Sequence, residues 1–430
     1  MTISTGSNRV FLFLQGPHGP FFQQLGRMLR HTGARVYRVG FNAGDQAFWR
    51  DKSSYIPYLD PADQWPDTLT TLIADKNITD LVLYGDTRPI HARAIECARA
   101  AGLRIHVYEE GYMRPYWVTY ERGGSNGNSQ LMHMNIKDMR KALNYTHADA
   151  SMPPASWGDM RHHIFYGAVY HGFLLLKNRR YGNFKPHRAL SVADEFRLYL
   201  RRLLLMPVQA VGRRLGTRRI RNGGFPYHLA LLQLEHDASF QAHSPFGSMT
   251  DFLATMVEGF AEGAPKHHHL VVKAHPLEDG RAPIRRTLQQ LARDYGITGR
   301  VHYLRGGKLA RLLDEARSAV TVNSTAGQQV LWRGIPLKTF GAAVYAKPEF
   351  VSTKPLIDFF AGAERPDREA YAIYRRYLLE TSQVAGGFYS ARGRRQLLRQ
   401  AVDMMLAHED PYEALKSGTA APRQQLHVVS

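Results

Sequence analysis

A chain of 430 residues with 44% hydrophobic residues is too long for one hydrophobic core and too apolar to be disordered, so we expect two or three globular domains. Its one cysteine, Cys97, excludes an intramolecular disulfide and suits a reducing cytoplasm. The net charge of +19 indicates an anionic partner, such as a lipid surface, a nucleic acid or an acidic glycan.

The first third of the chain alternates short apolar runs with helical stretches. Helices are predicted at 21–31 and 90–101, and strands at 10–15, 36–40, 80–84 and 104–108. Such runs, separated by helices and bounded by Gly, Pro or Asp, are typical of βαβ units with a parallel sheet. The apolar run at 10–14 is too short for a signal peptide, and no run approaches the length that spans a membrane, so we expect a cytoplasmic protein.

Most of the excess positive charge lies in residues 161–222, which hold 14 Lys and Arg residues but only two acids. Apolar clusters lie between the arginines, which predicts helices with one apolar and one cationic face. Such helices suit the surface of an anionic bilayer. The alternative is a charged helix pair that packs on its own domain.

The alternation of predicted strands and helices resumes near Phe225. Strands are predicted at 229–234, 269–273, 301–304, 319–322 and 336–340, with helices at 249–262, 283–295, 308–315 and 326–333. The sequence therefore predicts an α/β protein with two Rossmann-like domains that face a cleft, and a basic helical insertion. The predicted parts are 1–150, a linker and basic segment at 151–222, a second Rossmann-like domain at 223–366, and C-terminal helices with a polar tail at 367–430.

Two adjacent carboxylates, Glu109 and Glu110, stand where the strand at 104–108 ends, and Arg114 follows them. These residues are poor choices for packing. They suit a charged substrate, because open α/β sheets bind ligands outside the carboxyl ends of their strands. An exposed acidic turn is the alternative interpretation.

Two more loops of the first half follow predicted strands. Gly16 allows a close backbone approach just before a helix begins, which favours an anion or a sugar. Arg88 suits a carboxylate through its planar guanidinium group. A plain tight turn and an ordinary N-cap are the alternatives. The candidate substrate-binding residues of these loops are Gln15, Gly16, His18, Asp86, Arg88 and His91.

Two loops of the second half carry groups that suit a phosphate. Pro276 helps to aim the imidazole of His275, which is placed to donate to a phosphate as charge develops on it. Ser324 and Thr325 precede a predicted helix, where hydroxyl and N–H groups favour an anion, although ordinary capping is the alternative. The candidate donor-binding residues of these loops are Lys273, His275, Pro276, Asn323, Ser324 and Thr325. No metal-binding motif is present, so we expect no metal and no cofactor.

Taken together, these loops resemble the capsule polysaccharide biosynthesis family, and within it the smaller β-Kdo transferases that act at the start of capsule assembly. The resemblance covers about residues 9–360. No single motif is specific, but the combination is. The stretches that carry it are 11–17, 41–45, 84–91, 109–115, 117–121, 232–237, 243–246, 272–276 and 322–327.

The resemblance implies a GT-B-like architecture and a retaining transfer of Kdo from CMP-Kdo to a lyso-phosphatidylglycerol at the inner face of the cytoplasmic membrane. It implies that the first domain serves the acceptor and the second the nucleotide. Glu110 matches the motif's catalytic acid, which in related retaining transferases acts as nucleophile, and Glu109 supports it. Like-charge proximity would raise the pKa of one of the two carboxyl groups. His275, Ser324 and Thr325 match CMP-binding positions, and Gln233 and Asp237 match a nucleotide-side motif.

Two other functions stay open. A CDP-glycerol-type glycerophosphotransferase also uses a cytidine nucleotide and a His-Pro loop, but the carboxylate of Kdo needs an arginine, which Arg88 or Arg114 supplies. A basic, non-catalytic scaffold of the capsule assembly complex explains the charge but leaves Glu109 and Glu110 without a role. Nucleic acid is not expected as a partner, because basic strands with interleaved aromatic residues are missing.

Overall fold

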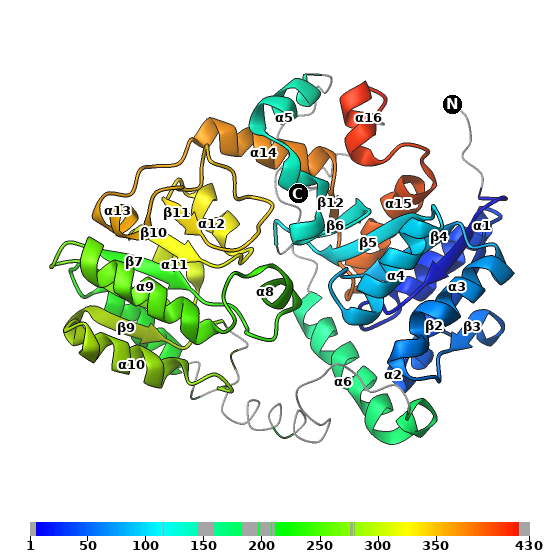
Figure 1. Cartoon of the computed structure of the whole chain (residues 1–430), viewed down its shortest axis with the longest axis horizontal. Helices are drawn as coiled ribbons and strands as arrows, with labels where there is room; N and C mark the ends of the chain where they lie inside the picture. The colour runs from blue at the N-terminus through cyan, green and yellow to red at the C-terminus, as the bar shows by residue number, and fades with distance from the viewer. Residues whose placement is uncertain are drawn as a thin grey trace. The chain divides into compact units, whose positions relative to one another are not determined.

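The computed structural model describes residues 6–114, 116–144, 159–182, 211–275 and 280–420, together with 197, 208 and 278. The chain forms two compact units, and each is built on its own sheet (Figure 1). Unit 1 comprises Met1–Gln130, Asp138–Asp194 and Arg376–Ser430, and unit 2 comprises Leu131–Lys137 and Glu195–Arg375.

Unit 1 contains a seven-stranded sheet in the order β12-β6-β5-β4-β1-β2-β3. The pairs from β3 to β5 are parallel, whereas β6 lies antiparallel to both β5 and β12. Its strands are β1 (Val10–Phe13), β2 (Arg35–Gly40), β3 (Tyr55–Pro57), β4 (Asp80–Tyr84), β5 (Arg104–Glu110), β6 (Trp117–Arg122) and β12 (Gln383–Ala385). Its helices include α1 (Phe21–His31), α2 (Ala43–Ala47), α3 (Trp65–Lys76), α4 (Pro89–Ala100), most of α5 (Ile136–Leu143), α6 (Asp159–Lys177), α15 (Ala391–Leu406) and α16 (Pro411–Ser417).

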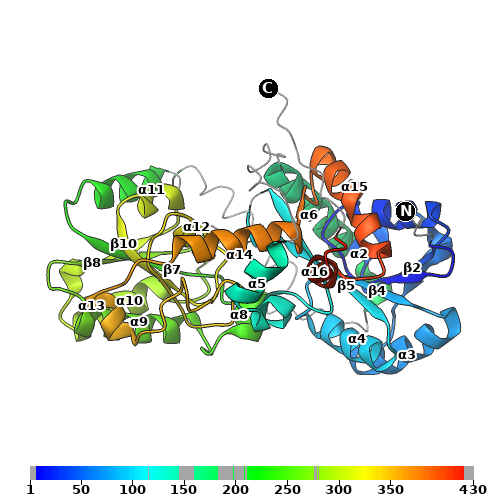
Figure 2. The same ribbon diagram turned by 90° about the horizontal axis from the view of Figure 1, so that it is seen from above.

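Helices cover both faces of this sheet, so the sequences of its central strands are continuous apolar runs. Along β1 the side chains alternate between two cores, because successive residues of a strand point to opposite faces. Phe11 and Phe13 pack with residues of α1 and α15, while Leu12 packs with residues of α3 and α4. Figure 2 shows α15 on one side of the sheet, and α3 and α4 on the other.

A network around a buried ion pair ties together four strands of unit 1, near the amino ends of β1, β4 and β5 and the carboxyl end of the antiparallel β6. Asp80, at the start of β4, is fully buried and accepts from Arg9 Nε at 2.6 Å. His106 Nε2 lies 2.8 Å from Asp80 Oδ1, and His106 Nδ1 lies 2.7 Å from the hydroxyl of Tyr120 on β6. The charge of Asp80 is therefore matched inside the protein, as a buried carboxylate requires.

Helix α6, at the start of the predicted basic segment, packs its inner face on unit 1. The hydroxyl of Tyr170 accepts from Asn42 Nδ2 at 2.7 Å, and its ring stacks on His18 at 4.2 Å between centroids. The outer face of α6 leaves large apolar side chains exposed, namely Ile164, Phe165, Leu175 and Leu176. Residues 211–221 are also helical, and most of the segment between them lies outside the described residues.

Unit 2 contains a fully parallel sheet in the order β11-β10-β7-β8-β9. One core joins this sheet to α9, α10 and α13. Its strands are β7 (Tyr227–Leu231), β8 (His269–Lys273), β9 (Val301–Leu304), β10 (Ala316–Thr321) and β11 (Leu337–Thr339). Its helices include α8 (Ala238–His243), α9 (Met249–Gly263), α10 (Ile284–Asp294), α11 (Leu309–Leu313), α12 (Gly327–Trp332) and α13 (Leu356–Ala361).

The predicted α/β class, with two Rossmann-like units in one chain as in GT-B enzymes, is confirmed. The division at residues 150, 222 and 366 stays a prediction. The compact units divide the chain differently at its C-terminal end, where β12 pairs with β6 and α15 covers the sheet of unit 1 (Figure 1). In the part of the chain that the structure describes, no helix is long and apolar enough to cross a membrane.

A chain of buried polar groups at the start of β7 makes the stability of unit 2 sensitive to pH. His228 is buried, with Nδ1 at 2.8 Å from Ser318 Oγ and Nε2 at 3.0 Å from His268 Nδ1. Burial, followed by the charge of His268, lowers the pKa of His228 to about 3. The imidazole is thus neutral in the folded protein, whereas in the unfolded chain it takes up a proton below pH of about 6.5.

Protonation of the unfolded state should therefore destabilise unit 2 as the pH falls from about 6.5 toward 3. Between pH of about 7.5 and about 5, we expect the free energy of opening of β7 to fall by about 2 kcal/mol. Amide hydrogen exchange in β7, measured by mass spectrometry, checks this. His228→Gln should flatten the pH dependence, and the exposed His267→Gln should retain it. An equal slope in the His228 variant would contradict the assignment.

Candidate active site

The carboxylate pair stands at the carboxyl edge of the unit 1 sheet. Glu109 and Glu110 are the last two residues of β5, and both are half-buried. Because they are neighbours in a strand, their side chains leave the sheet on opposite faces. Each carboxylate therefore meets a different set of groups.

Glu110 is oriented by two tyrosine hydroxyls. Tyr84, the last residue of β4, and Tyr389, in the loop between β12 and α15, both donate to Glu110 Oε1 at 3.2 Å. Phe388 packs edge-on against the ring of Tyr84, with 5.3 Å between centroids, and this contact steadies the loop. In the described part of the chain no group bonds to Glu110 Oε2, so this oxygen is the one available to a substrate.

Glu109 has a pKa close to neutrality. Burial and, less strongly, the charge of Glu110 raise the pKa of Glu109, while the N–H of Glu110 and the charges of Arg114 and Arg88 lower it, and the net result is a pKa of about 7. Its Oε1 accepts from the backbone N–H of Glu110 at 3.0 Å. Gly85 has a φ of 70°, and a Cβ there would lie 3.0 Å from Glu109 Oε2, so a glycine leaves room for this carboxylate.

The loop after Glu110 is held by the C-terminal part of the chain. Gln383, the first residue of β12, is fully buried and accepts from the backbone N–H of Tyr112 at 2.9 Å. Its amide group donates to Thr119 Oγ1 at 3.0 Å. This pair of bonds fixes the turn that carries Arg114, whose side chain is exposed.

The loops that follow β1 and β4 meet beside the carboxylates. Arg88 donates to Gln15 Oε1 at 3.4 Å and lies over the ring of Tyr84, 5.6 Å from its centroid. Gln15 in turn donates to the buried Asp45 at 3.0 Å. The loop at Gly16 and His18 rests on α6 through the stacking of His18.

Two of the predicted substrate-binding residues stabilise these loops from inside. Asp86 Oδ2 accepts from the backbone of Ser125 at 2.8 Å and from Asn128 Nδ2 at 3.1 Å. His91 Nδ1 lies 2.6 Å from the carbonyl of Gly85, and burial, with the charge of Arg88, lowers the pKa of His91 to about 3. His91 is therefore neutral at physiological pH. Its role in substrate binding, like that of Asp86, stays a prediction.

In unit 2, two amide side chains join the carboxyl ends of β7 and β10. Gln233 and Asn323 are both buried and form two bonds, from Gln233 Nε2 to Asn323 Oδ1 at 2.7 Å and from the Asn323 backbone to Gln233 Oε1 at 2.9 Å. Asn323 Nδ2 also donates to the carbonyl of Ser239, just inside α8, at 3.0 Å. The pair thus shapes the edge of the sheet where the other candidate residues stand.

Lys273, the last residue of β8, is the most distinctive group at this edge. It is buried, its burial lowers the pKa to about 8, and in the described part of the chain no carboxylate pairs with it. A buried cation of this kind is costly unless an anion accompanies it. His275 follows two residues later and is half-buried, whereas Pro276 lies outside the described residues.

The remaining candidates of unit 2 lie in turns before short helices. Ser324 Oγ accepts from the backbone N–H of Ala326 at 3.2 Å, so it forms a local turn before α12. Thr325 is half-buried beside it, and Asp237, before α8, is exposed. The structure therefore places these candidates at the carboxyl edge of one sheet, with Lys273 and His275 at the end of β8, and Ser324 and Thr325 after β10, on either side of β7.

A family model described as capsule polysaccharide biosynthesis protein matches residues 79–389, which is more than half of the chain. The chain belongs to the capsule polysaccharide biosynthesis family. This match runs from the start of β4 to Tyr389, so it includes the carboxylate pair, both tyrosines that bond to Glu110, and Lys273. The predicted family is confirmed.

Two relatives match over nearly their whole length. The capsule polysaccharide export protein KpsS of Escherichia coli is 29% identical over 389 residues, which cover 89% of this chain and 97% of that protein. The capsule polysaccharide modification protein LipB of Neisseria meningitidis serogroup B is 28% identical over 393 residues, which cover 88% and 91%. Among solved structures, the β-Kdo 2,7 transferase of Thermosulfurimonas dismutans KpsC is 12% identical with a TM-score of 0.44, covering 92% of this chain and 100% of that one.

Sequence reasoning missed the two tyrosines. Tyr84 had a usable signal, because a polar tip at the carboxyl end of a predicted strand is a candidate ligand contact. Tyr389 had none, since 279 residues separate it from Glu110 in the sequence. Lys273 was recognised only as part of the His-Pro loop, and its burial could not be read from the sequence.

The raised pKa of Glu109 can be measured by an NMR titration. Burial also raises the pKa of Glu121 to about 7, so with glutamate labelled by ¹³C at the side-chain carboxyl two resonances should titrate near 7. One of the two should disappear in Glu109→Gln and the other should remain. Arg114→Gln should move the pKa of Glu109 upward, because a nearby cation favours the charged carboxylate. The exposed Arg99→Gln, on α4, should leave it unchanged. The assignment is wrong if the resonance that Glu109→Gln removes titrates near the ordinary value of about 4.3.

Proposed function

We propose that the protein is a retaining β-Kdo glycosyltransferase that moves Kdo from CMP-Kdo to a lyso-phosphatidylglycerol acceptor and so begins the lipid linker of a capsule polysaccharide. Membership of the capsule polysaccharide biosynthesis family and the motif resemblance support this proposal. The observation that carries it is the pair of carboxylates in unlike environments. Glu110 is held by two hydroxyls on one oxygen, and Glu109 has a pKa of about 7.

In the first step of the proposed reaction, Glu110 Oε2 attacks the anomeric carbon of Kdo. The bond between that carbon and the phosphate oxygen breaks, and CMP leaves with the bonding electrons. The hydroxyls of Tyr84 and Tyr389 hold the attacking carboxylate in one orientation, which removes part of the entropic cost of the reaction. Arg88 and Arg114, which both act on Glu109 electrostatically, are the groups that suit the carboxylate of Kdo.

In the second step, an acceptor hydroxyl attacks the same carbon from the other face of the sugar, and the bond to Glu110 breaks. The hydroxyl proton must leave at this point, and Glu109 is the group suited to take it, because a base with a pKa near the working pH is the most effective. Two inversions at one carbon retain its configuration.

Unit 2 suits the phosphate of the departing nucleotide. As CMP leaves, negative charge grows on its phosphate, and Lys273 with His275 can balance that charge without a metal ion. Burial of Lys273 strengthens this interaction, since a charge pair is stronger where water is excluded. In this proposal CMP-Kdo is the donor substrate, and the reaction needs no cofactor.

We further propose that the protein works in the cytoplasm, on the inner face of the cytoplasmic membrane. The apolar outer face of α6 and the arginines of residues 211–221 support binding to an anionic bilayer. The anionic phospholipid acceptor resides in such a surface. Other proteins of capsule assembly are natural partners there, and nucleic acid is not part of the proposal.

The role of Glu110 can be tested directly with purified protein, CMP-Kdo and a short-chain lyso-phosphatidylglycerol. Glu110→Gln should lower the rate of Kdo transfer by about 1,000-fold or more, because a nucleophile is lost while the shape of the side chain is kept. Glu96→Gln, an exposed carboxylate on α4, is the matched control and should stay within about two-fold of wild type. Mass spectrometry of the lipid product gives both rates.

Three results of this assay would overturn the proposal. Retention of more than about a tenth of the rate in Glu110→Gln would place the nucleophile elsewhere. A wild-type protein that uses CDP-glycerol but not CMP-Kdo would instead be a glycerophosphotransferase. If the protein turns over neither donor, the result would favour a non-catalytic scaffold of the capsule assembly complex.

The donor site leads to a separate prediction for nucleotide binding. Lys273→Met should weaken CMP binding at least about ten-fold in isothermal titration, since the buried ammonium is lost, and His275→Ala should weaken it too. The fold should persist, because replacing an unpaired buried charge by a similar apolar side chain removes a desolvation cost. The control is Lys266→Met, an exposed lysine before the opposite end of β8. A strong requirement for Mg²⁺, seen as loss of CMP binding in EDTA, would contradict the metal-free site.

A further inference from the structure

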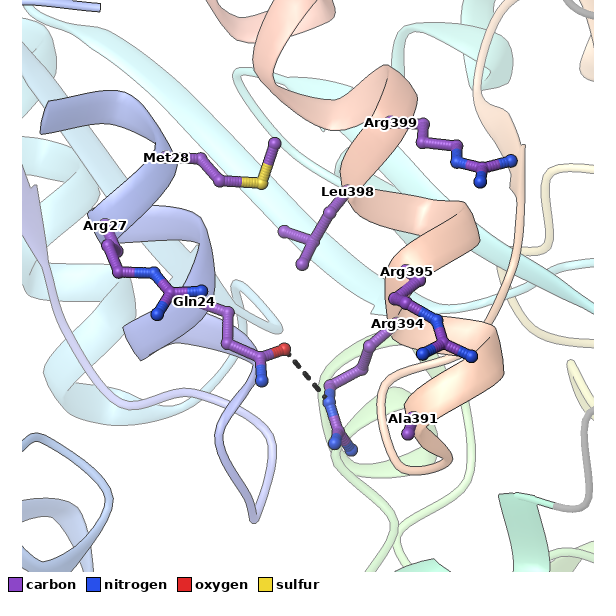
Figure 3. Close-up of a pocket in the computed structure, with 8 residues that line it drawn as sticks. All are labelled: Gln24, Arg27, Met28, Ala391, Arg394, Arg395, Leu398 and Arg399. Atoms are coloured by element: carbon purple, nitrogen blue, oxygen red, sulfur yellow. Dashed lines mark hydrogen bonds between the residues drawn. The ribbon is translucent and has the colours of Figure 1, made fainter. Parts of the chain in front are cut away.

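Unit 1 has an arginine-lined pocket between α1 and α15 that the proposed reaction does not use. It encloses about 450 Å³. Figure 3 shows Gln24, Arg27 and Met28 on α1 across from the residues contributed by α15. A smaller hollow of about 120 Å³ shares Gln24 and Arg27 and adds Arg50. The residues that α15 contributes are Ala391, Arg394, Arg395, Leu398 and Arg399.

The charge of this pocket is unbalanced. Four arginines and no acid line the larger hollow, and in the described part of the chain none of the four forms an ion pair with a carboxylate. Elsewhere in unit 1 the buried cation Arg38 is paired with Asp45. The pocket is thus a concentration of positive charge that the protein itself does not neutralise.

The arginines of α15 stand where they weaken their own helix. The first turns of α15 carry cations and no acid, although the amino end of a helix favours negative charge. Arg395 and Arg399 are four residues apart, so they lie on one side of the helix and repel each other. An anion bound between α1 and α15 would offset both the unfavourable charge at the amino end of α15 and the repulsion between Arg395 and Arg399.

Arg394 connects the pocket to the candidate active site. It is buried, donates from Nε to Gln24 Oε1 at 3.2 Å (Figure 3), and donates from Nη1 to the backbone carbonyl of Tyr389. Tyr389 is the residue whose hydroxyl bonds to Glu110. An occupant of the pocket therefore lies beside the arginine that holds the Tyr389 loop.

We propose that this pocket binds a phosphate-bearing anion, and that its occupant is the headgroup of an acidic phospholipid. Guanidinium groups match phosphate oxygens through paired N–H donors. Met28 and Leu398 supply an apolar surface next to the arginines, which suits the glycerol and acyl parts of a lipid better than a free phosphate ion. The inference concerns binding alone, so it does not rest on the identity of the sugar donor.

Binding of soluble, monomeric lipid tests the proposal without a membrane surface. Isothermal titration at about 150 mM salt compares dihexanoyl-phosphatidylglycerol, dihexanoyl-phosphatidylcholine and inorganic phosphate, with the lipids below their critical micelle concentration. We expect the phosphatidylglycerol to bind at least about ten-fold more tightly than the other two.

The arginines are tested by the triple variant Arg27→Gln, Arg395→Gln and Arg399→Gln. All three side chains are exposed, so the fold should persist, and without ligand the variant should melt no lower than wild type because helix repulsion is relieved. Its affinity for the phosphatidylglycerol should fall at least about ten-fold. The matched control loses equal charge at three other exposed arginines of unit 1, Arg35, Arg93 and Arg99, and should stay within about two-fold.

Three results would overturn the proposal. Equal binding by wild type and the pocket variant would place the lipid elsewhere. An equal loss in the control variant would show a response to net charge alone. Inorganic phosphate that binds as tightly as the lipid would overturn the lipid assignment and identify free phosphate as the occupant.

Discussion

The pairing of β12 with β6 is the interaction on which the candidate active site depends. This short antiparallel pair brings a segment from the end of the chain onto the sheet that carries Glu110. Gln383 then fixes the turn that follows the carboxylates, and Tyr389 donates to Glu110 itself. The site is therefore completed only when residues far apart in the sequence have joined one sheet. Such long-range closure is slow to form, but it positions side chains more precisely than a loop does.

Burial is what makes two neighbouring glutamates different. Glu109 and Glu110 are chemically identical and adjacent, yet strand geometry sends them to opposite faces of β5. Glu110 meets two hydroxyl donors, while Glu109 meets an environment that raises its pKa to about 7. In unit 2 burial acts on a cation instead and lowers the pKa of Lys273 to about 8.

The sequence predicted best what depends on local patterns. All five strands of unit 2 overlap the apolar runs that predicted them, although β7 and β10 begin earlier than expected. The central strands β7 and β8 are buried on both faces, which gives continuous apolar runs, whereas the edge strands β9 and β11 are partly exposed. In unit 1, the strands at 55–57, 117–122 and 383–385 were missed. The first and last are edge strands of three residues, and the strand at 117–122 is half-polar and lies between β5 and β12, so pairing partners decide the structure of all three. The carboxylate pair was found because strand ends are local features. The contacts of Tyr389 and Gln383 were not, because a contact across more than 260 residues leaves no local pattern.

The contacts of the Arg394 side chain link the arginine-lined pocket to the loop that orients Glu110. Its bond to the carbonyl of Tyr389 places a permanent cation behind the loop that carries the Glu110 contact, and its bond to Gln24 ties the same cation to α1. A buried guanidinium keeps its charge at every physiological pH, so it needs acceptors or an anion nearby. Its neutral acceptors, Gln24 Oε1 and the carbonyls of Phe388 and Tyr389, satisfy part of its hydrogen bonding and none of its charge. An anion held between α1 and α15 would supply that charge, and it would also stiffen the helix whose preceding loop orients Glu110.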